Sequence, residues 1–188
     1  DSAASVVLAD YQKQNDGDIC GVFFDYERGA ALAAEYLLQK GHRRIAFATN
    51  HLDRRSRVYR YESFGKTLRA NGVAFGEENT FLCSGETSFQ SGVELSDILL
   101  ESAYQPTAVA AINDTVASGI LSGLASKGVK VPDDISVIGF DDIVYAEMSY
   151  PPLTTVSIPV EKMGELAAKR LLDELSGGRE PYSIYMQP

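Results

Sequence analysis

The chain has 188 residues, 45% of them apolar, and its 17 basic against 26 acidic side chains give a formal net charge of −9 at pH 7. A chain of this length and apolar content can bury a full hydrophobic core, which excludes a wholly disordered chain. The acidic balance argues against DNA binding by this chain alone, because a DNA-binding surface needs concentrated lysine and arginine.

The longest apolar run, residues 19–24, is far shorter than a membrane span, and no signal segment opens the sequence. The chain starts at Asp1 instead of Met, and the pattern predicts a strand almost at once. We therefore expect a soluble fragment of a longer protein.

Short apolar segments rich in β-branched or aromatic residues recur along the chain, as is typical of buried parallel strands. They are residues 5–9, 21–24, 44–48, 108–112 and 136–140. Between most of them lie segments with apolar residues at helical spacing, at residues 30–38, 95–99 and 116–124. Helical segments end at Gly41, Gly72 and Gly128, where glycine can take the left-handed conformation.

After Pro151 and Pro152, the pattern predicts an extended stretch over residues 154–158, a helix over residues 160–175 and a final strand over residues 183–186. Strands and helices thus alternate along the chain. This order predicts an α/β fold with a doubly wound parallel sheet and helices on both faces.

Polar side chains follow the predicted strands, at the sheet edge where ligands bind in folds of this class. They are Asp25, residues 49–60, residues 84–86, Asn113 with Asp114, and Asp141 with Asp142. Carboxylates, amides and arginines supply the donors and acceptors that a hydroxyl-rich ligand needs. Asn113 or Asp141 taken alone could equally cap the helix that follows it, but their gathering on one edge favours binding.

Arginines gather in one part of this edge, around Ser56, at Arg54, Arg55, Arg57 and Arg60. Such a cluster is either a solvated basic face or a site for an anionic group of a ligand. The sequence leaves both readings open.

The usual signatures of catalysis are missing from the sequence, which has no GxSxG elbow, no glycine-rich phosphate loop and no HExxH pair. Of the two histidines, His42 follows a helix-ending glycine and His51 lies in a predicted loop. Asp141 and Asp142 are adjacent at a strand end and point in different directions, which argues against a proton-sharing pair. We expect no enzyme, no cofactor and no metal ion.

Four blocks of sequence make the chain resemble the effector-binding, periplasmic-binding-protein-like domain of the LacI/GalR family of transcription regulators. They are YLLQKGHRRI (residues 36–45), PTAVAAIND (residues 106–114), VPDDISVIGFDD (residues 131–142) and PPLTTV (residues 151–156), followed by Met163 and Gly164. The blocks occur in the family's order and cover most of the chain, so the match is more specific than a single short motif.

The resemblance implies two α/β subdomains with the effector between them, preceded by a helix-turn-helix headpiece that binds operator DNA as a dimer. It assigns residues 1–25 to a remnant of the N-terminal subdomain and residues 26–157 to the C-terminal subdomain. Residues 158–181 would return to the N-terminal subdomain as a helix, and residues 182–188 would be a final strand of the C-terminal one. Operator DNA would be bound only through the headpiece, which lies outside this chain.

By the same resemblance, the effector-contacting positions are Asp10, Arg54, Ser56, Arg60, Asn113 and Asp141, with Asp25 and Phe140 as weaker candidates. The sequence departs from the family pattern at Ser63, which replaces a glycine, at Thr87, which replaces an aromatic residue, and at Ile158, which replaces a polar one. Phe89 is a nearby candidate for the missing aromatic wall.

The implied function is sensing of a small polar metabolite, a sugar or a nucleoside-like compound, by a cytoplasmic, homodimeric regulator without a membrane partner. Effector binding would shift the populations of two conformations and so change operator affinity. The alternative is a periplasmic sugar receptor of a transporter, which shares the fold. The reading frame upstream of Asp1 separates the two.

Two variants, Arg60→Ala and Asp141→Ala, are expected to abolish the effector response and to leave folding largely intact, because neither residue should belong to the core. The helix over residues 90–100 is a candidate dimer contact by resemblance. Its apolar residues are equally explained by packing on the sheet.

Overall fold

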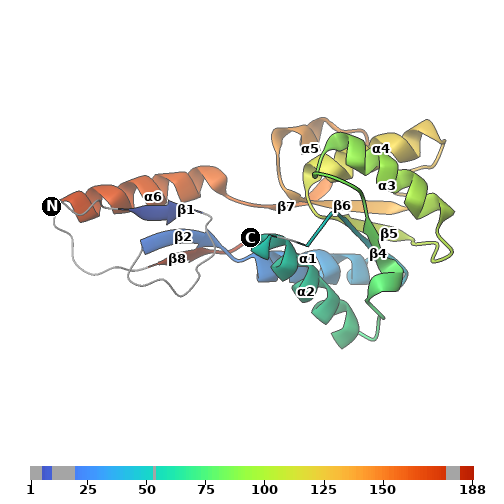
Figure 1. The fold of residues 1–188 in the computed structure, drawn as a ribbon, viewed down its shortest axis with the longest axis horizontal. Coiled ribbons are helices and arrows are strands. Elements are labelled where there is room, and N and C mark those ends of the chain that lie inside the picture. Colours follow the sequence, from blue (N-terminus) through green and yellow to red (C-terminus); the bar gives the residue numbers. More distant parts are fainter. Residues whose placement is uncertain (1–5, 10–19, 53, 177–182) are drawn as a thin grey trace. The chain divides into compact units, whose positions relative to one another are not determined.

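The computed structural model describes residues 6–9, 20–52, 54–176 and 183–188. Contacts divide the chain into two units, a larger one of residues 26–157 and a smaller one of residues 1–25 with 158–188. Each unit has its own parallel sheet (Figure 1).

The larger unit is built on a five-stranded parallel sheet. Its strands are β3 (Ile45–Thr49), β4 (Thr80–Leu82), β5 (Ala108–Ala111), β6 (Ser136–Asp141) and β7 (Thr154–Ser157), in the order β4-β3-β5-β6-β7. Its helices are α1 (Tyr26–Gln39), α2 (Arg55–Ala70), α3 (Phe89–Glu101), α4 (Asp114–Ser126), the short α5 (Val144–Met148) and the 3-10 turn η1 (Glu77–Asn79). Helices α1 and α2 pack together on one face of the sheet, and α3 and α4 on the other (Figure 1). The expected doubly wound α/β fold is therefore confirmed.

Strand β3 is buried along its whole length, as its apolar run predicts. Its Phe47 ring packs against α2 and the segment after it, with centroid distances of 5.2 Å to Phe64 and 6.2 Å to Phe75. All three aromatic side chains are buried. This packing fixes α2 against the sheet and so fixes the start of α2 close to the end of β3.

Glycines let α3 and α4 approach each other closely. A Cβ atom added at Gly92 would lie 2.2 Å from the carbonyl oxygen of Val116, and one added at Gly119 would lie 2.0 Å from the carbonyl oxygen of Phe89. These distances are shorter than any real contact of a Cβ atom, so only glycine fits. Packing on α4 accounts for one side of the helix predicted over residues 90–100.

The smaller unit has a three-stranded parallel sheet with one helix packed against it. Its elements are β1 (Val7–Ala9), β2 (Cys20–Phe24), α6 (Val160–Leu175) and β8 (Ile184–Met186), and the strand order is β1-β2-β8. None of the helices in the described parts of either unit is long and apolar enough to cross a lipid bilayer.

The final strand does not lie where the family resemblance placed it. Residues 182–188 were expected to join the larger unit, but β8 pairs with β2 in the smaller one, with Ile184 opposite Val22. The amide of Asp25 continues this pairing by donating to the carbonyl oxygen of Met186 over 2.9 Å. That expectation is wrong because a strand of three residues carries no pattern that tells which sheet it joins.

Candidate functional site

The strands of the larger unit run parallel, so their carboxyl ends meet at one edge of the sheet, which we call the carboxyl edge. Ligands bind at this edge in doubly wound folds. The residues that end or follow β3, β5 and β6 here are Asn50, Ile112 with Asn113, and Asp141 with Asp142.

Arg60 of α2 joins the ends of two of these strands. Its side chain is buried, and the residue as a whole is 8% exposed. Its Nη1 donates a hydrogen bond to the carbonyl oxygen of Ile112 over 2.6 Å, and its Nη2 donates to Oδ1 of Asp141 over 3.1 Å. The planar guanidinium group can make both bonds at once because its donors form a fixed fork.

The Arg60 guanidinium packs on two aromatic rings. Its central carbon is 3.9 Å from the ring centroid of Phe140 and 4.7 Å from that of Tyr26, and the two rings stack on each other. Cation–π attraction adds to the ion pair with Asp141 and offsets part of the desolvation of a buried charge. Phe140, a weaker candidate for ligand contact, is therefore a buried support for Arg60.

This burial corrects two expectations about Arg60. It is not part of a solvated basic face, and its replacement by alanine cannot leave folding untouched, because it would leave the Ile112 carbonyl and the Asp141 carboxylate without their donors. No local pattern indicates this burial, since burial of a charged side chain depends on partners from distant strands.

Asp141 is held in an unusual backbone conformation. Its φ is 112° and that of the next residue, Asp142, is 58°. Non-glycine residues rarely adopt positive φ, and such strain persists only where the surroundings fix it, most often at functional sites. The Asp141 side chain is 31% exposed, so it is the member of the ion pair that solvent and ligands can reach.

Asn113 caps α4, which was the alternative reading of this residue. Its Oδ1 accepts a hydrogen bond from the amide of Val116 over 2.9 Å. The cap does not exclude ligand contact, because it uses an oxygen of the side chain and an amide has donors as well. Asn113 also follows Ile112, whose carbonyl binds Arg60, so the structure brings Asn113 close to the ion pair.

The neighbouring Asp114 was grouped with the polar residues of this edge but not with the predicted effector contacts, and it is a buried carboxylate. Its Oδ2 accepts from the amide of Ile143 over 2.9 Å, and its Oδ1 accepts from Oγ1 of Thr155 over 2.5 Å. Burial raises the pKa of Asp114, and its hydrogen bonds lower it. An acidic residue in the first turn of a helix is a common local pattern. Only its hydrogen bonds to Ile143 and Thr155 distinguish Asp114 from an ordinary residue of this kind.

Buried polar atoms at the carboxyl edge have unused hydrogen-bonding capacity. Within the described part of the chain, Thr49 Oγ1, Asn50 Oδ1 and Arg60 Nε are buried and have no hydrogen-bond partner. The Asn50 Nδ2 donates to the carbonyl oxygen of Gly85, which fixes the side chain in place. Buried polar groups are rarely left unpaired, so their gathering at one edge points to a polar ligand or to water.

The other predicted site residues are less closely connected to the ion pair. Arg54 is exposed and occupies the N-cap position of α2 without a capping side-chain bond, and Ser56 is half-buried in the first turn of that helix. Asp25 lies in the smaller unit, where its Oδ2 accepts from Nε2 of Gln187. Asp10 lies outside the described residues.

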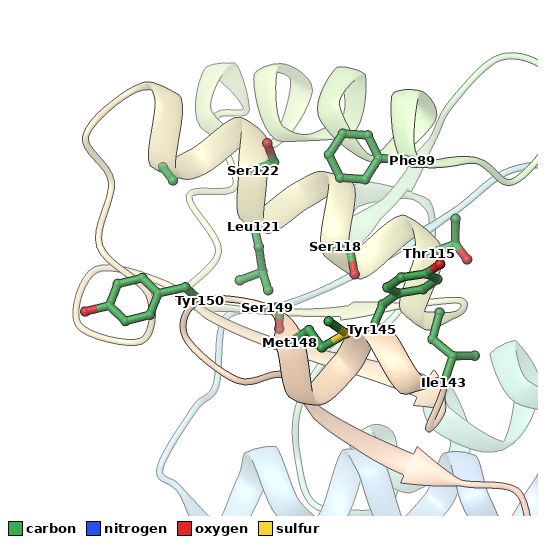
Figure 2. Close-up of a pocket in the computed structure, with 11 residues that line it drawn as sticks. Phe89, Thr115, Ser118, Leu121, Ser122, Ile143, Tyr145, Met148, Ser149 and Tyr150 are labelled. Atoms are coloured by element: carbon green, nitrogen blue, oxygen red, sulfur yellow. The ribbon is translucent and has the colours of Figure 1, made fainter.

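Thr87 stands where the family has an aromatic residue at the effector site, and Phe89 was the candidate to replace that residue. The two side chains have different surroundings in the structure. Thr87 Oγ1 accepts from Nη2 of Arg57 over 3.4 Å, whereas Phe89 begins α3 and lines an apolar groove beside α4 (Figure 2). Phe89 is therefore a wall of that groove.

The groove is a second feature of the larger unit and has a volume of about 660 Å³. In Figure 2, side chains of α4, including Ser118 and Leu121, face Tyr145 and Met148 of α5. Tyr145 and Met148 are 64% and 74% exposed, and Tyr150 just after α5 is 95% exposed. Sequence periodicity missed this surface because α5 has only five residues.

Comparison with known families gives a match over most of the chain. A family model described as a periplasmic binding protein-like domain matches residues 34–187. The chain is 38% identical over 149 residues to the HTH-type transcriptional repressor PurR of Vibrio atlanticus, which covers 79% of this chain and 44% of that protein. It is 35% identical over 157 residues to the HTH-type transcriptional regulator AscG of Escherichia coli, which covers 84% of this chain and 46% of that protein.

A solved structure agrees with these relatives. A LacI family transcriptional regulator from Enterococcus faecium with bound ribose is similar at a TM-score of 0.85 and 32% identity, over 96% of this chain and 66% of that one. All three proteins are named as transcription regulators and none as an enzyme. The chain spans about half the length of the curated relatives it matches.

Proposed function

Because the chain belongs to the LacI family of transcription regulators and matches a periplasmic binding protein-like domain, we propose that it is the effector-sensing part of a cytoplasmic regulator. The effector is a small hydroxyl-rich metabolite, a sugar or a nucleoside-like compound. Its binding shifts the populations of two conformations that differ in operator affinity, and a helix-turn-helix headpiece outside this chain contacts the DNA.

The observation that carries the proposal is the ion pair of Arg60 and Asp141 at the carboxyl edge. Asp141 is partly exposed and can accept hydrogen bonds from two neighbouring hydroxyl groups of a ligand. Arg60, which packs on the Phe140 ring, holds that carboxylate in place before the ligand binds. This preorganisation lowers the entropy that is lost on binding. A hydroxyl-rich ligand matches such a fixed acceptor.

Neighbouring polar groups extend this site. Asn113 offers amide donors beside the ion pair, and the buried Asn50 Oδ1 and Thr49 Oγ1 at the same edge have acceptor capacity for a ligand hydroxyl. Arg54 and Ser56 stay predictions as contacts for the outer part of the ligand, and Asp10 and Asp25 stay predictions from the family resemblance.

The site is tested by calorimetric titration of the full-length protein with D-ribose, hexoses, disaccharides, hexuronic acids and nucleosides. Asp141→Asn keeps the size of the side chain and removes its charge, so affinity for the compound that binds should fall about 10-fold or more. Asp97→Asn is the matched control, because Asp97 is exposed and pairs with Lys127 on another part of the unit. Unchanged affinity in Asp141→Asn contradicts the site, and no binding by any of these compounds contradicts the effector class.

The regulatory role is tested separately from the site. The reading frame upstream of Asp1 should encode a helix-turn-helix headpiece, and the full-length protein should bind DNA with an affinity that changes when effector is added. A signal segment in that place would make the protein a periplasmic receptor and would contradict the regulatory role.

The groove between α4 and α5 supports the proposed homodimer. Helix-turn-helix regulators bind two-fold symmetric operators as dimers, and such a dimer needs a surface that is complementary to its own copy. Tyr145, Met148 and Tyr150 project next to an apolar hollow, which gives one surface both protruding and receiving parts. Large exposed apolar side chains on one patch are typical of an interface.

Sedimentation analysis of the full-length protein tests this surface. Tyr145→Ser combined with Met148→Ser should weaken dimerisation about 10-fold or more, because both large side chains would leave the interface. Val160→Ser combined with Leu175→Ser replaces two equally exposed apolar residues of α6 and is the matched control. A wild-type monomer, or a dimer unaffected by the α5 variant, contradicts the proposed surface.

A further inference from the structure

We propose that the buried carboxylate of Asp114 is a positioning residue for the effector site. It holds the turn of residues 140–143 in the one conformation that presents Asp141 to Arg60. The inference rests on the proposed function in one respect, that this turn carries the effector-binding carboxylate. It adds a residue that does not contact effector and acts through Asp141.

The carboxylate of Asp114 is a hub for the backbone of this turn. Asp114 is fully buried, and its Oδ2 accepts from the amide of Ile143 over 2.9 Å. The backbone amides of Phe140 and Asp142 lie near enough to lower the pKa of the carboxyl, against the effect of burial. Asp114 therefore bonds the backbone just after Asp141 and lies beside the amides of the two residues that flank it.

The conformation that these bonds enclose is one that the chain would not adopt unaided. The φ of Asp141 lies far outside the left-handed region that Asp142 occupies, and such a conformation persists only where its surroundings fix it. The hydrogen bonds to Asp114 and the ion pair with Arg60 restrain this turn through side chains, in addition to the pairing of Asp141 with Ser157 in the sheet. Removing the hydrogen bonds to Asp114 should therefore loosen the ion pair between Asp141 and Arg60.

Asp114 can act as a fixed anchor because it is itself held from other directions. It lies in the first turn of α4, which Asn113 caps, and its Oδ1 accepts from Oγ1 of Thr155 on β7. Gly139 leaves room for the carboxylate, since a Cβ atom there would lie 2.1 Å from Oδ1. The anchor is thus tied to a helix and a neighbouring strand and does not follow movements of the turn.

The experiment compares the Arg60 side chain in variants of the full-length protein, without effector. Selective ¹⁵N labelling of arginine, with Arg60→Lys for assignment, gives the solvent exchange rate of the Nη2 protons that bond Asp141. Asp114→Asn removes the charge that the turn amides need and should speed this exchange about 10-fold or more. Thr155→Val removes a single bond to the anchor and should have a smaller effect in the same direction. Hydrogen exchange of residues 140–143 is measured in parallel by mass spectrometry.

Thr107→Val is the matched control, since it removes the same hydroxyl group at the opposite end of β5. It should leave Arg60 exchange at the wild-type rate. A variant Asp114→Asn in which the turn exchanges faster but Arg60 does not would show a purely structural role and overturn the proposal. Equal acceleration in Thr107→Val would overturn it too, since general loosening would then be the cause. Should Asp114→Asn fail to fold, Thr155→Val decides between the same outcomes.

The readout separates this inference from the proposed function. Arg60 exchange needs no ligand, so the positioning role can fail while calorimetry still finds an effector that depends on Asp141. Conversely, if no compound binds, the proposed function fails while the effect of Asp114 on Arg60 remains measurable.

Discussion

The two edges of the five-stranded sheet are held together in different ways. At the edge where the strands begin, side chains bond directly across neighbouring segments: His42 Nδ1 pairs with Oγ1 of Thr107 over 3.0 Å, and Arg44 Nε donates to the carbonyl oxygen of Gln105 over 2.9 Å. At the carboxyl edge, a buried arginine pairs with Asp141 beside polar atoms that lack partners among the described residues. The bonds at the edge where the strands begin stabilise the sheet. The carboxyl edge keeps hydrogen-bonding capacity that a ligand can use.

Backbone conformation shows the same contrast. At the first edge, the turns after α1 and α4 place positive φ on Gly41 and Gly128, which take it without strain, and Gln105 at φ 47° stays near the ordinary left-handed region. At the carboxyl edge, φ of 112° falls on Asp141, far outside that region. A strained conformation is thus found where a carboxylate is needed and glycine cannot replace it.

The sharpest test of this contrast is removal of one arginine from each edge. Arg60→Ala should lower the free energy of unfolding by about 3 kcal/mol, because it removes a buried arginine, leaves the Ile112 carbonyl and the Asp141 carboxylate without their donor, and opens a cavity beside two aromatic rings. Arg44→Ala should lower it by about 0.5 kcal/mol, because its side-chain bond is exposed to solvent. Urea unfolding of both variants measures the difference. Equal losses would mean that the carboxyl edge is no more dependent on buried charge than the other edge.

Two glycines distinguish the cost of a steric clash from the cost of an unfavourable backbone conformation. Gly139→Ala should lower the free energy of unfolding by about 3 kcal/mol, because the new Cβ would displace the buried Asp114 carboxylate and press on Leu153. Gly128→Ala meets no neighbouring atom and only its positive φ opposes the side chain, so we expect a loss of about 1 kcal/mol. The same unfolding measurement ranks them. A smaller loss for Gly139→Ala would show that the Asp114 anchor can shift without resistance.

The fold could be predicted from sequence to a large extent, for a physical reason. The central strands β3, β5 and β6 of the larger unit are buried on both faces and the helices between the strands have a clear period, so hydrophobic pattern and connection length leave few topologies. The pattern predicted the strand at residues 183–186 but did not tell that β8 joins the smaller sheet, and it missed the five-residue α5. Both elements are too short to show a period.

The candidate site was predicted at the level of the edge and less well at the level of single side chains. The predicted strand ends placed Asn113 and Asp141 at this edge correctly, because the position of a residue after a strand is a local property of the sequence. The burial of Arg60 depends on its contact with Asp141, which is 81 positions away in the sequence. The proposed role of Asp114 depends on its contact with Thr155, which is 41 positions away. Such contacts exist only in the folded chain, so no local pattern records them.

The buried carboxylate of the carboxyl edge should give stability a characteristic dependence on pH. Burial raises the pKa of Asp114 above its ordinary value of 3.8, although hydrogen bonds from Thr155 and from backbone amides act in the opposite direction. Above pH 3.8 the folded state therefore keeps a proton that the unfolded chain releases, and stability falls as the pH rises from there through the folded-state pKa. The difference in unfolding free energy between wild type and Asp114→Asn should shrink over that range. A difference that grows with pH would mean that the hydrogen bonds outweigh burial.

The histidine at the other edge should respond with the opposite sign and the smallest effect. Burial lowers the pKa of His42 below its ordinary value of 6.5. The unfolded chain then binds a proton that the folded state rejects, so stability falls as the pH drops from 6.5 through the folded-state pKa. His42→Gln keeps a polar partner for Thr107 and removes the titrating group, so urea unfolding should lose part of its slope below pH 6.5 in this variant. Since His42 is only half-buried, the change should be a few tenths of a kcal/mol, about the size of a typical surface substitution. An unchanged slope would assign the acid sensitivity in this range to other groups and would leave the carboxyl edge as the pH-responsive end of the sheet.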